Sequence, residues 1–130
     1  MPDPVRVVLC DDVAMLRELL RYELEEDDDV RVVGEASDGL ESVRMVADLK
    51  PDVVVLDLAM PGLDGLEAIP LMRAIDPPPQ IVVHSGFDSE LMSERVLALG
   101  AARYIEKGGD LSVVRNAVRA LIESGPARSA

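Results

Sequence analysis

Short apolar runs recur along the chain, and β-branched residues dominate most of them. Short runs of this composition predict strands rather than helices. The run that begins at Val30 is more alternating than the others, because Arg31 interrupts it. The five predicted strands are Val5–Cys10, Val30–Gly34, Val53–Leu56, Ile81–His84 and Ala102–Ile105.

The segments between these runs carry apolar residues at helical spacing. Leu16, Leu20 and Leu24 recur every four residues and give the first segment one apolar face. Proline or glycine follows each of the later segments, as is typical of helix ends. After the first helix around Leu16–Leu24, the predicted helices are Gly39–Lys50, Leu66–Ile75, Ser89–Leu99 and Leu111–Ser124.

Regular alternation of strand and helix predicts an α/β fold in which helices cover both faces of a parallel sheet. The flavodoxin-like doubly wound (βα)5 arrangement, with strand order 2-1-3-4-5, is the common five-stranded solution. Residues 1–124 would form this one domain, and residues 125–130 a linker or frayed tail. The acidic run Glu25–Asp29 reads as a solvated loop.

Composition narrows the possible environments and partners. The chain has a formal net charge of −12, so it should repel nucleic acid and anionic membranes. No apolar run reaches the roughly 20 residues of a membrane span. Cys10 is the only cysteine, which excludes an internal disulfide. We therefore expect a soluble cytoplasmic protein that binds neither nucleic acid nor membrane directly.

Reactive polar residues follow four of the predicted strands. Because parallel strands present their carboxyl ends at one edge of the sheet, these side chains should converge near the switch point between the first and third strands. They are Asp11 and Asp12 after the first strand, Asp57 after the third, Ser85 after the fourth and Lys107 after the fifth.

Three carboxylates in one crevice repel each other and need a cation nearby. Carboxylate oxygens without His or Cys suit Mg²⁺, which also accepts phosphate as a ligand. Mg²⁺ and Lys107 together would balance the charge of Asp11, Asp12 and Asp57. A carboxylate can attack phosphorus, and phosphoryl transfer needs mainly positioning and charge neutralisation.

Each residue also has a structural alternative. Asp11 or Asp12 could cap the first helix, and Asp57 could be a loop residue. Ser85 could cap a helix or form a local turn, and Lys107 could be a surface charge. Their coincidence at four strand ends favours a site, because independent features then agree.

The stretch Asp57–Gly65, which reads DLAMPGLDG, resembles the signature of receiver domains from two-component response regulators. The acidic pair after the first strand, the pair Ser85-Gly86, Tyr104 and Lys107 match further positions of that family. The resemblance covers about residues 5 to 124 and agrees with the predicted fold.

The resemblance implies that Asp57 accepts a phosphoryl group from a sensor histidine kinase. Asp12, Asp57 and the backbone carbonyl of Ala59 would bind Mg²⁺ directly, with Asp11 acting through water. Lys107 and Ser85 would hold phosphate oxygens. The protein would be a phosphoacceptor with self-catalysed transfer and autodephosphorylation, rather than an enzyme that acts on another molecule.

The resemblance also implies a switch. Movement of Ser85 toward the phosphate would let Tyr104 move inward and would rearrange the fourth helix, fifth strand and fifth helix. That surface would control an output or partner, and it offers a route to a homodimer. Val32–Ala36 with Asp38-Gly39 resembles receivers that precede LuxR-type helix-turn-helix domains, so we expect control of transcription.

The sequence departs from the family after the fifth strand, where Lys107-Gly108 replaces the common Lys-Pro pair. Without proline, a cis bond costs about 2.5–4 kcal/mol, so we predict a trans bond. Gly108 can instead take a positive φ. We also expect a looser Lys107, with its amine displaced from Asp57 in the absence of phosphate and Mg²⁺.

Three other protein classes are alternatives to a receiver. A haloacid-dehalogenase-like phosphatase needs a second aspartate where Ala59 stands. A flavodoxin needs a phosphate loop where Asp11 and Asp12 stand, and these carboxylates would repel a phosphate. A stand-alone receiver or a pseudo-receiver could act by protein–protein binding, but a pseudo-receiver would not need Asp12, Asp57 and Lys107.

Overall fold

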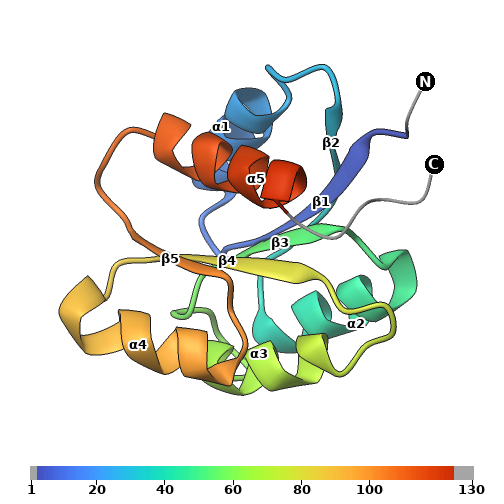
Figure 1. Cartoon of the computed structure of the whole chain (residues 1–130). Coiled ribbons are helices and arrows are strands. Elements are labelled where there is room, and N and C mark those ends of the chain that lie inside the picture. Colours follow the sequence, from blue (N-terminus) through green and yellow to red (C-terminus); the bar gives the residue numbers. More distant parts are fainter. Residues whose placement is uncertain (1–2, 125–130) are drawn as a thin grey trace.

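The computed structural model describes residues 3–124 and alternates strands with helices throughout (Figure 1). The predicted linker at residues 125–130 lies outside the described residues. The elements are β1 (Val5–Cys10), α1 (Ala14–Leu24), β2 (Val30–Ala36), α2 (Gly39–Leu49), β3 (Val53–Leu56), α3 (Gly65–Arg73), β4 (Gln80–Ser85), α4 (Ser89–Leu99), β5 (Arg103–Glu106) and α5 (Ser112–Ser124).

The strands form one parallel sheet in the order β2-β1-β3-β4-β5, which confirms the predicted flavodoxin-like topology. Helices α1 and α5 cover one face of the sheet, and α2, α3 and α4 cover the other (Figure 1). Alternate residues of β1 serve the two cores: Val7 and Leu9 pack toward α1 and α5, whereas Val8 and Cys10 pack toward α2 and α3. Burial on both faces explains why the strands are nearly continuous apolar runs.

Strand β2 is longer than predicted. It continues through Gly34 and Glu35 to Ala36, which pairs with Cys10 of β1. The pattern hid this extension because glycine and a charged residue interrupt the apolar run. The extension brings Glu35 beside the carboxyl end of β1.

Helix α3 ends at Arg73, two residues before the predicted end at Ile75. Pro70 lies inside the helix. Asp64 caps its start, as expected, by accepting a hydrogen bond from the backbone N–H of Leu66 at 2.9 Å. A Cβ at Gly65 would lie 2.5 Å from the Cα of Leu58, so only glycine permits this approach. The close packing fixes α3 against the segment that follows Asp57.

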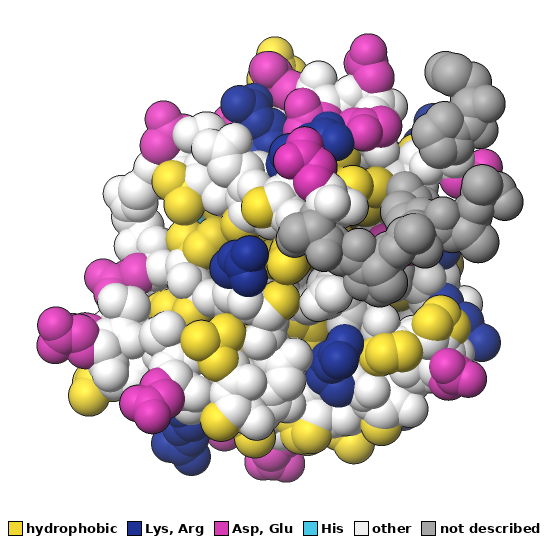
Figure 2. Space-filling view, viewed as in Figure 1, with side chains coloured by type: hydrophobic (Ala, Val, Ile, Leu, Met, Phe, Trp, Pro, Cys, Tyr) yellow, Lys and Arg dark blue, Asp and Glu magenta, His cyan; other side chains and the backbone are white. Residues whose placement is uncertain are grey.

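The acidic run Glu25–Asp29 is a largely exposed loop, as predicted, but it also carries ion pairs that the sequence did not show. Arg119 of α5 pairs with Asp27 at 3.2 Å and also with Asp29. Arg115 lies 2.7 Å from Glu23 at the end of α1. Figure 2 shows acidic and basic side chains gathered at the top of the molecule. The loop is therefore tied to α5.

No helix among the described residues is long and apolar enough to cross a membrane.

Candidate phosphoryl-acceptor site

Asp11 and Asp57 are placed by backbone hydrogen bonds that continue the sheet beyond the strand ends. The Asp57 N–H donates to the Cys10 carbonyl at 2.8 Å, and the Asp11 N–H donates to the Ala36 carbonyl at 3.0 Å. Both aspartates are buried, with 3% of each residue exposed. Their position at adjacent strands β1 and β3 is the predicted switch point.

Lys107 joins the two buried carboxylates. Its Nζ lies 2.8 Å from Oδ2 of Asp11 and 3.0 Å from Oδ2 of Asp57. Although burial alone would lower the pKa of Lys107, hydrogen bonds to both aspartates outweigh it and raise that pKa. The expectation of a displaced amine is therefore wrong: the Lys107 amine pairs with Asp57, because two buried carboxylates attract it.

The turn after Lys107 has the predicted backbone. The Lys107–Gly108 bond is trans, since the one cis bond in the described chain joins Asp76 and Pro77. Gly108 takes a φ of 113°, a region that favours glycine. The Lys107 N–H also donates to the Ser85 carbonyl at 2.8 Å, so the lysine is anchored to β4 as well.

Asp12 completes an acidic cluster. One oxygen from each of Asp11, Asp12 and Asp57 lies within 4.8 Å of the others, and Asp12 is the exposed member. Three hard carboxylate oxygens fit a small divalent cation such as Mg²⁺. Neither aspartate caps α1, because Val13 holds the capping position and no side chain caps the helix there.

Ser85 and Tyr104 lie beside the cluster but are not joined to it. Ser85 is fully buried, and its Oγ has no hydrogen-bond partner among the described residues. The hydroxyl of the half-buried Tyr104 donates to the backbone carbonyl of Phe87, in the loop between β4 and α4. Tyr104 thus connects β5 to the loop that follows Ser85.

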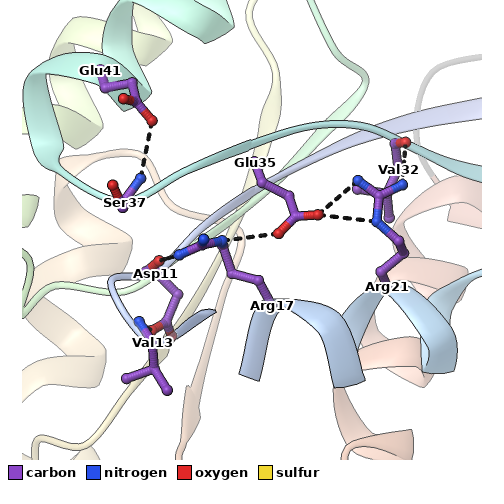
Figure 3. A network of polar contacts seen from close by, with 8 residues as sticks. All are labelled: Asp11, Val13, Arg17, Arg21, Val32, Glu35, Ser37 and Glu41. Carbon is purple, nitrogen blue, oxygen red and sulfur yellow. Dashed lines mark hydrogen bonds and ion pairs between the residues drawn. The ribbon is translucent and has the colours of Figure 1, made fainter. Parts of the chain in front are cut away.

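Two residues near the site did not emerge from the sequence. Arg17 of α1 donates through Nη1 to the Asp11 carbonyl at 2.6 Å and through Nε to Oε1 of Glu35 at 2.9 Å (Figure 3). The arginines at 17 and 21 share one face of a helix, a spacing that could have signalled a common acidic partner. Their partner could not be identified because Glu35 lies in the unpredicted part of β2.

The sequence model of the response regulator receiver domain family matches residues 7–119 of the chain. The chain belongs to the response regulator receiver family. This receiver domain is 39% identical over 123 residues to the transcriptional regulatory protein LiaR of Bacillus subtilis, covering 94% of the chain. It is 44% identical over 110 residues to a protein-glutamate methylesterase/protein-glutamine glutaminase of Azospirillum brasilense, covering 81% of the chain.

Solved receiver structures agree with this assignment. The signal receiver domain of NarL from Mycobacterium tuberculosis superposes with a TM-score of 0.87 at 32% identity, covering 95% of this chain and 99% of that one. The present receiver spans 58% of LiaR and 27% of the Azospirillum methylesterase. The family excludes the flavodoxin and haloacid-dehalogenase alternatives, whereas the whole relatives differ widely in what they do.

Proposed function

We propose that this receiver accepts a phosphoryl group on Asp57 from a sensor histidine kinase. The observation that carries the proposal is the Asp57 carboxylate, buried at the end of β3 within an acidic cluster and 3.0 Å from the Lys107 amine. A carboxylate oxygen of Asp57 would attack phosphorus while the bond from phosphorus to the kinase's histidine nitrogen breaks. The histidine keeps that electron pair, and the product is an aspartyl-phosphate.

The neighbouring residues fit the charge that this transfer brings. Asp12, Asp57 and the backbone carbonyl of Ala59 would hold Mg²⁺ directly, and Asp11 would hold it through water. The bound cation would supply charge neutralisation for the incoming phosphate. Lys107 would release part of its pairing with Asp57 to bind a phosphoryl oxygen. Ser85 would bind another, which would give its unpartnered hydroxyl an acceptor.

The output surface would be α4, β5 and α5. Movement of Ser85 toward the phosphate would act on the loop that Tyr104 binds through Phe87, and so on the start of α4. LiaR is a transcriptional regulatory protein, and the sequence features around Glu35 favour the same kind of output. We infer that the receiver works in the cytoplasm and controls transcription through a partner domain, with a homodimer through this surface as one route.

Intact mass measurement tests the acceptor. Treatment with acetyl phosphate and Mg²⁺ should add one phosphoryl group to the unmodified protein and none to the Asp57→Asn variant. Equal modification of both would contradict the assignment. A protein that gains no mass at all would instead support the pseudo-receiver, which acts by protein binding alone.

Calorimetric titration with Mg²⁺ tests the metal site. Asp12→Ala removes one carboxylate of the cluster and should weaken Mg²⁺ binding about tenfold and slow phosphorylation. Asp28→Ala is the matched control. Asp28 is an exposed aspartate just before β2, at the amino ends of the strands, whereas the acidic cluster lies at their carboxyl ends. Equal Mg²⁺ affinity in the two variants would contradict the proposed site.

A further inference from the structure

Arg17 of α1 bonds both to the segment that follows β1 and to Glu35 of the neighbouring strand β2. Its Nη1 donates to the backbone carbonyl of Asp11 at 2.6 Å, and its Nε donates to the Glu35 carboxylate at 2.9 Å. The side chain is 17% exposed, and that of Glu35 is 28% exposed, so water screens the ion pair only in part. Figure 3 shows the guanidinium lying between β2 and the segment that follows β1.

The carbonyl that Arg17 binds belongs to the peptide group between Asp11 and Asp12. Because a peptide group is planar, fixing its oxygen also fixes the plane that leads into Asp12. Asp11 is further held at its N–H by Ala36 and at Oδ1 by the N–H of Val13, at 3.0 and 2.9 Å. The Asp12 side chain is exposed, so its backbone position decides whether its carboxylate can reach the other two aspartates.

A second arginine on the same helix offers an internal comparison. Arg21 binds the same Glu35 carboxylate, with Nε and Nη2 lying 3.0 and 2.8 Å from Oε2. Its Nη1 donates to the Val32 carbonyl at 3.2 Å. Val32 lies near the start of β2, whereas the acidic cluster lies near the end of that strand. The two arginines therefore share the ion pair, and only Arg17 reaches the acidic cluster.

We propose that Arg17 is a positioning residue for the cation site, holding the Asp11–Asp12 peptide so that the Asp12 carboxylate faces Asp57, and that Glu35 holds Arg17 in place. This inference rests on the proposed function, because it concerns the same acidic cluster. Partners that orient metal ligands typically contribute 10–100-fold to metal affinity. The charge of Arg17 alone would act in the opposite direction, since a cation near the cluster repels Mg²⁺.

The test compares Arg17→Met with Arg21→Met. Both changes remove one arginine and one partner of Glu35, so both should lower thermal stability. Calorimetric titration with Mg²⁺ should show about tenfold weaker binding in Arg17→Met and nearly unchanged binding in Arg21→Met. Equal affinities in the two variants, or tighter binding in Arg17→Met, would overturn the proposal.

A third variant guards against failure of Arg17→Met to fold. Arg17→Lys keeps the charge beside Glu35, but an ammonium lacks the fork that reaches two acceptors in fixed directions. Its Mg²⁺ affinity should lie below that of the unmodified protein, and an unchanged affinity would overturn the proposal. The mass gain of the unmodified protein with acetyl phosphate separates the outcomes: if that gain occurs while Arg17 and Arg21 variants bind Mg²⁺ alike, only this inference fails.

Discussion

Ser85 and Ser42 are both fully buried serines, yet their hydroxyl groups differ in hydrogen bonding. Ser42 donates to the Asp38 carbonyl at 2.7 Å, whereas Ser85 Oγ has no partner among residues 3–124. A buried polar group without a partner costs free energy, while a made hydrogen bond contributes about 1 kcal/mol. We therefore expect Ser85→Ala to raise the free energy of unfolding by about 1 kcal/mol and Ser42→Ala to lower it by about 1 kcal/mol.

Denaturant unfolding of the two variants checks this difference, and acetyl phosphate treatment checks its functional side. Loss of a donor to a phosphoryl oxygen should slow phosphorylation of Ser85→Ala by about tenfold. Ser42→Ala should be phosphorylated at the normal rate. A Ser85→Ala protein that is destabilised and reacts normally would show that the hydroxyl serves packing and not the site.

Helix α1 and strand β2 meet in the ion pairs of Glu35. Burial alone would raise the pKa of Glu35, but hydrogen bonds from Arg21 and then Arg17 outweigh it and hold that pKa below its ordinary value of 4.5. A carboxyl whose folded pKa is depressed contributes stability that is present above its unfolded pKa. This contribution is lost as the pH falls through the lower, folded pKa.

Glu35→Gln tests this contact between the two elements. The unmodified protein should be more stable than the variant at neutral pH, and the difference should shrink as the pH is lowered below 4.5. Unfolding followed by circular dichroism at a series of pH values measures the difference in stability between the two proteins. The other carboxylates are the same in both, so their effects cancel in this difference. A difference that stays constant from neutral to acid pH would contradict the assigned ion pairs.

The order of the strands and the members of the acidic cluster could be predicted from the sequence. Both depend on general properties of parallel sheets: right-handed crossovers restrict the strand order, and carboxyl ends of strands gather polar residues at one edge. Asp11, Asp57 and Lys107 each follow a strand directly. A predicted strand end that is wrong by one residue therefore still places these side chains together.

Contacts between distant segments could not be predicted. The partner of Arg119 is 90 residues away at Asp29, and periodicity shows which face of α5 is apolar without showing what its charged residues meet. The same limit applied to Arg17 and Glu35. The engagement of Lys107 differs from the prediction because the attraction of two buried carboxylates outweighs the local freedom of Gly108.

Phosphorylation should reach the rest of the molecule through one edge of the sheet. Ser85 ends β4, and the loop after it runs into α4. The Tyr104 hydroxyl binds that loop at Phe87, and the Ser89 N–H donates to Glu106 of β5 at 2.8 Å. A shift of Ser85 toward Asp57 would therefore disturb contacts between β5 and α4 first. Helix α1 and the α1–β2 loop are tied to α5 through Arg115 and Arg119, which limits motion there.

Hydrogen exchange with and without beryllofluoride and Mg²⁺ tests this route across the whole chain, since beryllofluoride on Asp57 imitates the phosphoryl group. The largest changes in exchange should fall within residues 86 to 120, because they include the loop that Tyr104 binds, α4 and β5. The Asp57→Asn variant, treated in the same way, should show no change. Changes confined to α1 would contradict the α4–β5–α5 surface and would point to an output through α1 instead.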